Sequence, residues 1–510
     1  MSRIRIMICR VNEKNPAEMT EIASYDLPET EIRTLDPERT LDEMEATLHK
    51  QGQAVLQRAL QAQFEEMDRD LVEAYRQDFP PDEVVGDGHS AVKVISRFGR
   101  LELKRQVLSH SQGQETKHTM PGNQALPVHN GLIVTRGVQE MICLFSLDLP
   151  FATVERLLAW NIQEESLLSS TTNRTLIRAH GQIIRQAEAA EVEALLAQDE
   201  WSGLRPQLVA SKTPRRQASW PAEIQETVAQ ALAVGQVTPP QGVSLEDWER
   251  VIANRRTELP DVENLRRLGP QLRADQVMAC VDEVLTRKPE KRAFWELRTA
   301  YVATVDGHRY LSGIGQSFLM QLLVLLLILG VRDKGNLLLI ADGARWIRNF
   351  FAQYCLHLPN AQILLDWYHL RHKLSSFASM ICRGKAAKIH FLSSLGGYLW
   401  RGDASAALEF LRAYRPETKS EAKLDELIDY LHARQDAIPN YQERRKHRLY
   451  IGSALVEKAN DLIVARRQKN KGMHWSLESS NALAALKTLL LNDGWNLYWE
   501  QRQVLPLVAS

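Results

Sequence analysis

The sequence has few cysteines and no arrangement of them that could build a site. Its 510 residues include five cysteines, which lie far apart and contain no Cys-x-x-Cys pair: Cys9, Cys143, Cys280, Cys355 and Cys382. This spacing argues against a disulfide framework and against a cysteine-rich zinc module. It is typical of a protein that works in a reducing compartment, so we expect a cytoplasmic location.

An excess of charge and a long hydrophobic run are also missing. Lys and Arg number 63, and Asp and Glu number 63, so any basic surface must be local. The longest apolar run, residues 318–330, is shorter than the roughly 18 residues of a membrane span and is interrupted by Gln321. The first residues carry charges where an export signal needs an apolar core. We therefore expect a buried core helix at 318–330 and no membrane contact.

The length predicts three or four domains, and composition and periodicity divide the chain further. We expect the following parts: an amino-terminal region with a helix (1–85), a basic β-hairpin (86–125), a helix-turn-helix-like domain (126–200), a proline-rich and helical linker (201–270), the first part of an α/β core (271–375), a helical insertion (376–441) and the second part of the core (442–510).

The amino-terminal half contains one candidate segment for reading DNA. A short predicted helix at 151–162 is followed by a polar helix from Ser169, the spacing of a major-groove reader. The first turns of the second helix would present Arg174 and Arg178. Plain helical bundles have the same pattern, so this interpretation has an alternative. The cations of the hairpin at 89–109 likewise lie either on a solvated face or against phosphate.

The carboxy-terminal half predicts a mixed sheet covered by helices. Two strands surround the hairpin signal Asp306-Gly307 and complete a three-stranded meander, which a helix, a strand, a helix and a fifth strand follow. A long helical stretch then precedes a last helix at 452–468. This order matches a ribonuclease H-like α/β domain with a helical insertion after its fifth strand. The preceding domains are expected to be mainly helical.

Three acidic residues occupy positions that converge in such a domain. Asp282 lies on the first strand, Asp342 ends the fourth, and Glu457 lies on the late helix that packs over both. Clustered carboxylates repel one another unless a cation is present, and Mg²⁺ prefers oxygen ligands. Two such ions can activate an attacking oxygen and stabilise a leaving one. The sequence therefore predicts a site for two Mg²⁺ or Mn²⁺ ions that works on phosphodiesters.

Neighbouring carboxylates are alternatives to these three. Glu283 is adjacent to the first one, and Asp306 is a rival for it, although its place in a hairpin turn marks it as a turn residue. Asp342 could be a simple helix cap. Glu443 and Asp461 are rivals for the helical carboxylate, and Asp461 lies one turn beyond it on the same helix face.

Several segments together resemble the DDE transposases of bacterial insertion sequences, in particular the Mutator-like superfamily. Residues 337–374 contain an Asp-Gly-Ala-x-Trp run and the element Asp-Trp-Tyr-His. Residues 452–495 contain Gly-Ser before a Glu, an Arg after it and a Gly-Met-x-Trp-Ser motif. Residues 281–289 are similar to the family's first-Asp segment. The resemblance covers roughly residues 85–500 and is strongest from 275.

The resemblance implies a transposase that binds the terminal repeats of a mobile element and catalyses metal-dependent DNA cleavage and strand transfer. Asp282, Asp342 and Glu457 would be its catalytic and metal-binding residues, with Asp366 and His369 as accessory residues. His369 could equally be a packing residue. The implied partners are double-stranded DNA, as element ends and target, and further copies of the chain in a dimer or larger assembly at the bacterial nucleoid. Unlike some relatives, the chain has no cysteine between Cys9 and Cys143, which argues against an amino-terminal zinc site.

A local excess of positive charge supports a DNA substrate. Residues 444–471 carry nine cations and two acids, and phosphate contacts from such a face give affinity without reading sequence. The predicted DNA contacts there are Arg466, Arg467, Lys469 and Lys471, joined by Trp475. Trp475 either stacks on a base or sugar or packs in the core. Two other functions stay open: a catalytically inactive, domesticated DNA-binding protein, and a nuclease of the same fold without strand transfer.

Overall fold

The chain forms two compact units, residues 1–177 and 178–510. The computed structural model describes residues 5–12, 14–26, 40–80, 83–112, 115–126, 132–198, 241–243, 272, 276–290, 293–334, 336–356, 358, 360–469 and 472–507. The boundary falls inside one helix, α4 (Ser170–Leu196). Nearly all of the predicted linker at 201–270 lies outside the described residues.

The amino-terminal unit contains two sheets, so the prediction of mainly helical domains before the core is wrong for its first part. The two strands of one sheet are antiparallel, and the other sheet has the order β5-β4-β3-β6. These strands are β1 (Arg5–Asn12), β2 (Asn15–Asp26), β3 (Val84–Ser96), β4 (Gly99–Gln112), β5 (Glu115–Thr119) and β6 (Leu132–Val134). The residues of β2 are mostly exposed, so its sequence lacks the apolar alternation that marks a half-buried strand.

The predicted long helix and basic hairpin are both present in this unit. Helix α1 spans Thr40–Gln77, and β3 and β4 form the hairpin. Three of the hairpin's five cations are engaged inside the unit. Arg97 pairs with Glu140 and Arg100 with Glu164, at 3.1 and 3.3 Å, and Arg105 donates to Asn123. These contacts favour a structural role for the hairpin cations.

The predicted helix-turn-helix region is helical throughout its later part. Helices α2 (Arg136–Ser146) and α3 (Phe151–Ile162) precede α4. Arg174, in the second turn of α4, is exposed and lies 5.7 Å from the ring centroid of Phe151. The second half of α4 belongs to the carboxy-terminal unit, where it packs against α18 (Leu477–Leu491).

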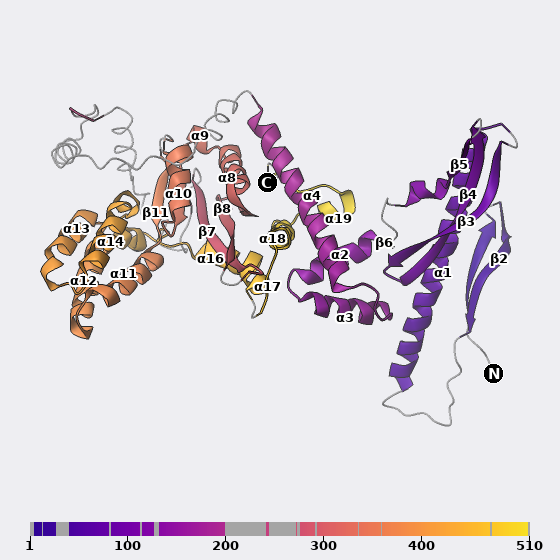
Figure 1. Ribbon diagram of the computed structural model, residues 1–510, viewed down its shortest axis with the longest axis horizontal. Helices are drawn as coiled ribbons and strands as arrows, with labels where there is room; N and C mark the ends of the chain where they lie inside the picture. The colour runs from indigo at the N-terminus through magenta and orange to yellow at the C-terminus, as the bar shows by residue number, and fades with distance from the viewer. Residues whose placement is uncertain are drawn as a thin grey trace. The chain divides into compact units, whose positions relative to one another are not determined.

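A five-stranded mixed sheet of order β11-β10-β7-β8-β9 forms the centre of the carboxy-terminal unit (Figure 1). Strands β7, β8 and β9 form the predicted antiparallel meander, and β10 is parallel to both β7 and β11. The strands are β7 (Val277–Arg287), β8 (Phe294–Ala303), β9 (His308–Gly313), β10 (Leu337–Ala341) and β11 (Gln362–Leu365). The predicted mixed sheet is therefore confirmed.

Helices cover both faces of this sheet. Helices α8 (Gly315–Ile328) and α10 (Arg345–Phe350) cover one face. The other is covered by α11 (Trp367–Ile381) and α16 (Ala454–Asn460). The insertion helices α12 (Lys385–Trp400), α13 (Ala404–Ala413) and α14 (Glu421–His432) extend the same core by packing on α11 and on one another. Alternate residues of β7 and β10 point to the two faces, odd-numbered ones toward α8 and even-numbered ones toward α11.

The longest apolar run forms the buried helix α8, as the sequence predicted. Across the part of the chain that the structure describes, no helix combines the length and the apolar character that crossing a membrane requires.

Candidate active site

Asp282 and Asp342 lie on one face of the sheet, at the place where β10 ends beside the middle of β7. Strands β7 and β10 are parallel, and Val281 is paired with Ala341, so the two aspartates directly follow paired residues. Both have even numbers, and the even-numbered residues of these strands face α11 and α16. The register therefore brings together two of the three carboxylates that the sequence singled out.

The alternation also separates Glu283 from this pair. Glu283 points to the opposite face and accepts a hydrogen bond from the indole N–H of Trp346, which lies 4.2 Å below the Arg298 guanidinium. Asp306 is exposed in the turn between β8 and β9. Asp306 lines a different hollow from Asp342, whereas Glu283 lines the same cleft as Asp342 although it points to the other face.

The Asp282 carboxylate is fixed by hydrogen bonds from two sides. One oxygen accepts from the backbone N–H of Glu283 at 2.8 Å, and the other accepts from Nδ2 of Asn460, the last residue of α16, at 2.7 Å. Asn460 Oδ1 in turn accepts a hydrogen bond from the Thr299 hydroxyl on β8. The sequence analysis missed Asn460, although it lies three residues after Glu457, on the same helix face.

Burial, together with the negative charge of Asp342, raises the pKa of Asp282 to about 6, against the hydrogen bonds and the nearby His369. Ionising this carboxylate is therefore unfavourable in the protein alone, and a cation at this edge would relieve the cost.

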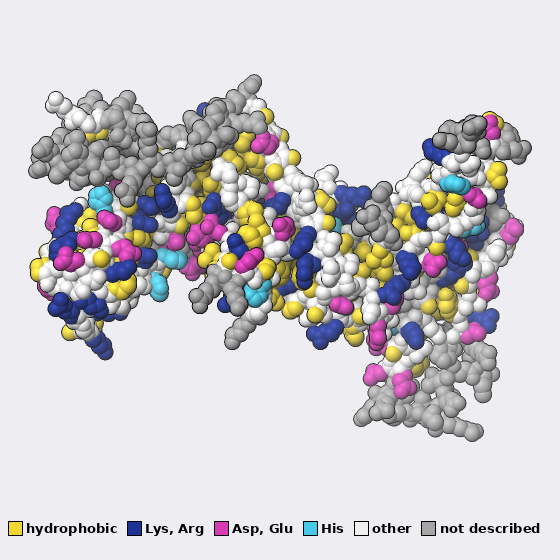
Figure 2. Space-filling view, in the orientation of Figure 1, with side chains coloured by type: hydrophobic (Ala, Val, Ile, Leu, Met, Phe, Trp, Pro, Cys, Tyr) yellow, Lys and Arg dark blue, Asp and Glu magenta, His cyan; other side chains and the backbone are white. Residues whose placement is uncertain are grey.

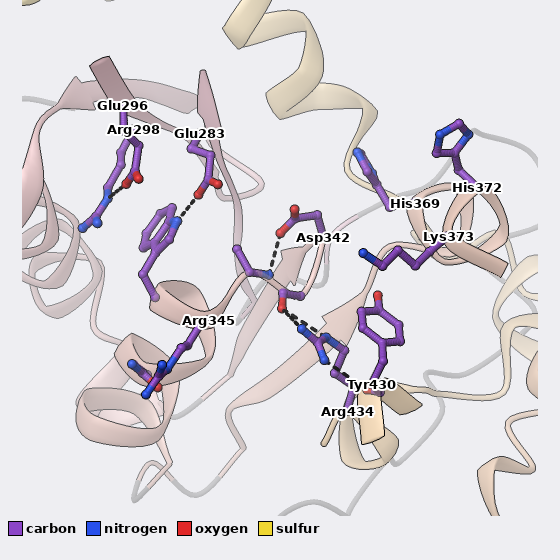
Figure 3. A pocket seen from close by; sticks show the side chains of 14 residues that line it. Glu283, Glu296, Arg298, Asp342, Arg345, His369, His372, Lys373, Tyr430 and Arg434 are labelled. Atoms are coloured by element: carbon purple, nitrogen blue, oxygen red, sulfur yellow. Dashed lines mark hydrogen bonds and ion pairs between the residues drawn. The ribbon is translucent and has the colours of Figure 1, made fainter. Parts of the chain in front are cut away.

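Asp342 both points to the site and caps the turn that carries it. Its Oδ1 accepts the backbone N–H of Ala344 at 2.7 Å. The intervening Gly343 has φ +84°, a conformation that favours glycine. Arg434 Nε and Nη2 donate to the Gly343 carbonyl at 3.1 and 2.8 Å, and Figure 3 shows this fork closing on the turn. The helical insertion thus holds the turn that presents Asp342.

Asp366 is a fully buried anchor. Its Oδ1 accepts the backbone N–H groups of Tyr368 and His369, and its Oδ2 accepts the N–H and hydroxyl of Ser453. Burial alone would raise the pKa of Asp366, but hydrogen bonds from His369 and Ser453 outweigh burial and lower it to about 2. Both oxygens are used, so Asp366 joins the start of α11 to the start of α16.

His369 lies between two carboxylates. Its Nδ1 is 3.4 Å from Asp366 Oδ2 and 3.7 Å from Glu457 Oε1. Hydrogen bonding to Asp366 raises the pKa of His369 to about 9, with further contributions from the charges of Asp282 and Asp342. The imidazole is therefore protonated near neutral pH and connects Glu457 electrostatically to the aspartate pair.

Among the described residues, only Asp366, His369 and Glu457 form a trio whose ligand atoms lie within 4.8 Å of one another. The ligand atoms of the predicted trio, Asp282, Asp342 and Glu457, do not all lie within this distance of one another.

A divalent ion fits the aspartate pair better than it fits the tighter trio. Asp366 has no oxygen to spare, because both of its oxygens accept hydrogen bonds. Asp282 and Asp342 offer the hard carboxylate oxygens that Mg²⁺ and Mn²⁺ prefer. Glu457 is 52% exposed and lies 3.7 Å from His369.

The two alternatives to Glu457 are occupied by cations. Glu443 lies 3.4 Å from His447 and 3.7 Å from Lys446. Asp461 lies 2.8 Å from Arg466.

Two of the predicted DNA contacts are core residues instead. Trp475 is 5% exposed, and its indole N–H donates to the Gln468 carbonyl. Arg467 is 3% exposed and lies 4.8 Å from the Trp475 ring centroid. Burial leaves neither side chain accessible to DNA, so Trp475 follows the alternative of a core tryptophan.

The other predicted DNA contacts differ in their exposure and in their hydrogen bonds. Arg178 donates to the hydroxyls of Ser476 and Ser479, which ties α4 to the start of α18. Arg466 and Lys469 are exposed, and Lys471 lies outside the described residues.

A cleft of about 610 Å³ opens beside the Asp342 turn (Figure 3). Its lining includes Asp342 and Glu283 at the sheet edge, His369 and Lys373 from α11, and Arg434 from the insertion. Its volume is in the range of ordinary ligand pockets. Asp342 is therefore accessible to a substrate from this cleft.

No protein-family model matches the chain, and no curated protein matches it.

Proposed function

We propose that this chain is a DDE-type DNA transposase with a ribonuclease H-like core. It would bind the terminal repeats of a mobile element and catalyse cleavage and strand transfer of DNA. The observation that carries the proposal is the pairing of Val281 with Ala341, which puts Asp282 and Asp342 side by side on one face. The strand order β11-β10-β7-β8-β9 and the place of Glu457 on α16 support the same function.

Asp282, Asp342 and Glu457 would hold two Mg²⁺ or Mn²⁺ ions. When bound, these ions stabilise the negative charge that develops on phosphodiester oxygens. Asn460 orients the Asp282 carboxylate, and Arg434 holds the turn of Asp342. Each ligand is thus fixed by a residue from a different element, as precise metal sites require.

His369 serves as a fixed positive charge behind the ligands. Its proton stays on the imidazole near neutral pH because its pKa is about 9. Asp366 holds one side of the ring and Glu457 contacts the same nitrogen, at 3.4 and 3.7 Å. The pair Asp366–His369 therefore positions Glu457 and balances part of the charge of the site.

The reaction has two steps that need no covalent link to the protein. Water attacks the phosphorus at the element end, its oxygen joins the 5′-phosphate, and the 3′-hydroxyl leaves. That 3′-hydroxyl then attacks a phosphodiester of target DNA and displaces a target 3′-hydroxyl. Because two element ends must be joined to one target, we expect a dimer or larger assembly on DNA at the bacterial nucleoid.

The test uses purified protein, Mg²⁺ and labelled DNA that carries the sequences flanking the coding region, where the terminal repeats would lie. A transposase gives both cut products and products joined to a target plasmid. Cut products without joining would favour a nuclease, and binding without cutting would favour a domesticated DNA-binding protein. Either result overturns the proposal.

A further inference from the structure

The cleft beside Asp342 has a cationic rim that the carboxylates do not explain. His372 and Lys373 lie on the exposed side of α11 and line the cleft together with Tyr430 and Arg434 of the insertion. In Figure 3 the Lys373 side chain extends from α11 toward the turn of Asp342. A positive group thus points at the place where the proposed function puts a phosphodiester.

Two arginines of the cleft are already engaged. Arg434 donates to the Gly343 carbonyl, and Arg298 pairs with Glu296 at 2.9 Å. In the part of the chain that the structure describes, neither His372 nor Lys373 forms an ion pair through its side chain. These two residues can therefore meet an incoming anion, as can Arg345, an exposed arginine that also lines the cleft.

Tyr430 positions the rim rather than offering a stacking surface. The Arg434 guanidinium lies 3.9 Å from its ring centroid, and the Lys373 ammonium lies 5.5 Å from it. Lys373 is also 5.6 Å from the ring of Phe377. Aromatic rings attract cations in this range, so they guide the lysine across the cleft without neutralising it.

The rim differs from the rest of the insertion in its charge. Figure 2 shows Lys and Arg interspersed with Asp and Glu over α13 and α14, as on an ordinary solvated surface. Ion pairs such as Lys423 with Glu426, at 2.6 Å, belong to that surface. At the rim, cations of α11 face the carboxylates of the sheet across a cleft, an arrangement that suits an anion bridging the two.

We propose that Lys373, aided by His372, binds the DNA backbone phosphate next to the one that is cut. This inference rests on the proposed function, because that function supplies the DNA strand crossing Asp282 and Asp342. The ions at the carboxylates neutralise the reacting phosphate, and its neighbour needs a cation of the protein. A lysine is a point charge that contacts phosphate without reading sequence, so the contact positions the strand for any base at the cut.

The test measures binding of the full-length protein to a short fluorescent single-stranded DNA of mixed sequence, over a range of salt concentrations. Ca²⁺ replaces Mg²⁺ to fill the site. Lys373→Gln is expected to weaken binding about tenfold and to reduce the slope of log affinity against log salt by about 1. Lys373→Arg keeps the charge and is expected to retain most of the affinity.

Lys385→Gln is the matched control, because Lys385 is an exposed lysine of α12 that does not line the cleft. If Lys373→Gln and Lys385→Gln bind alike, the inference is wrong, whereas cutting and joining by the wild type would leave the proposed function intact. If Lys373→Gln alone weakens binding but the wild type does not cut, the phosphate contact stands and the proposed function fails.

Discussion

We predicted that two regions of the carboxy-terminal unit contact DNA. The structure places the side chains of these two regions differently. At the edge of β7 and β10, backbone register places Asp282 beside Asp342. In the segment after α16, a count of charges pointed to a DNA-binding face, but Arg467 and Trp475 are buried against each other. Strand pairing fixes where a side chain points, whereas the charge of a segment does not.

The buried pair has a physical explanation. An arginine can cover an aromatic ring with its planar guanidinium while its stem packs on apolar neighbours. The Trp475 N–H and the Gln468 carbonyl satisfy each other at 3.0 Å. The basic segment therefore closes the core near α18 and leaves Arg466 and Lys469 at the surface.

The largest effect is expected from removing one of the paired carboxylates. Asp342→Asn keeps the shape of the turn but loses a ligand charge, and it should lower Mg²⁺-dependent DNA cleavage by about a thousandfold or more. The measurement is the rate of cleavage of labelled end DNA at saturating protein. Asp306→Asn, in the exposed turn between β8 and β9, is the control and should retain full activity. Equal rates for the two variants would remove Asp342 from the chemistry.

A second variant tests whether Trp475, in the basic segment, has a structural role. Trp475→Ala should lower the free energy of unfolding of the carboxy-terminal unit by about 3–5 kcal/mol, because it leaves a cavity. Trp160→Ala, at a tryptophan that is 74% exposed, should change stability by no more than about 0.5 kcal/mol. Urea unfolding followed by circular dichroism measures both. A stable Trp475→Ala protein that had lost DNA affinity would instead favour a stacking role.

A third variant tests whether Asn460 holds the Asp282 carboxylate for metal binding. Asn460→Ala removes the hydrogen bond to Asp282 and should raise the Mg²⁺ concentration for half-maximal cleavage by about 10–100-fold. Asn492→Ala is a matched control, because Asn492 accepts from the backbone N–H of Tyr310 and lines no part of the site. A purely structural role for Asn460 predicts that both variants lose stability and that neither changes the metal requirement.

The smallest effect concerns pH and stability without divalent ions. The pKa of Asp282 is about 6 in the folded protein against 3.8 ordinarily, so the fold favours the protonated carboxyl. Its contribution to stability is present below about pH 4 and is lost as the pH rises through about 6. Asp282→Asn should therefore stabilise the protein by about 1–2 kcal/mol near neutral pH in a chelator. Thermal unfolding at several pH values measures this, and an equal gain at pH 4 would contradict the cause given.

Much of the central sheet was predictable because its signals are local. The apolar strand before Asp342, the Asp306-Gly307 turn and the buried run of α8 each mark an element within a few residues. The two amino-terminal strands were not predictable, since β2 is exposed nearly throughout and has no apolar face to alternate.

The candidate site was likewise predictable only in part. Asp282 and Asp342 could be placed because strand order makes their strands neighbours. Asn460 and Arg434 could not, since their contacts depend on how α16 and the insertion dock, and no periodicity encodes that. Trp475 had two plausible environments, and only the packing around Gln468 decides between them.

The most direct test of the central claim is Mn²⁺ binding to the full-length protein, measured by electron paramagnetic resonance. The account predicts that the wild type binds Mn²⁺ and that Asp282→Asn and Asp342→Asn each weaken this binding by about tenfold or more. Mn²⁺ bound equally tightly by the wild type and by a protein carrying both substitutions would contradict it.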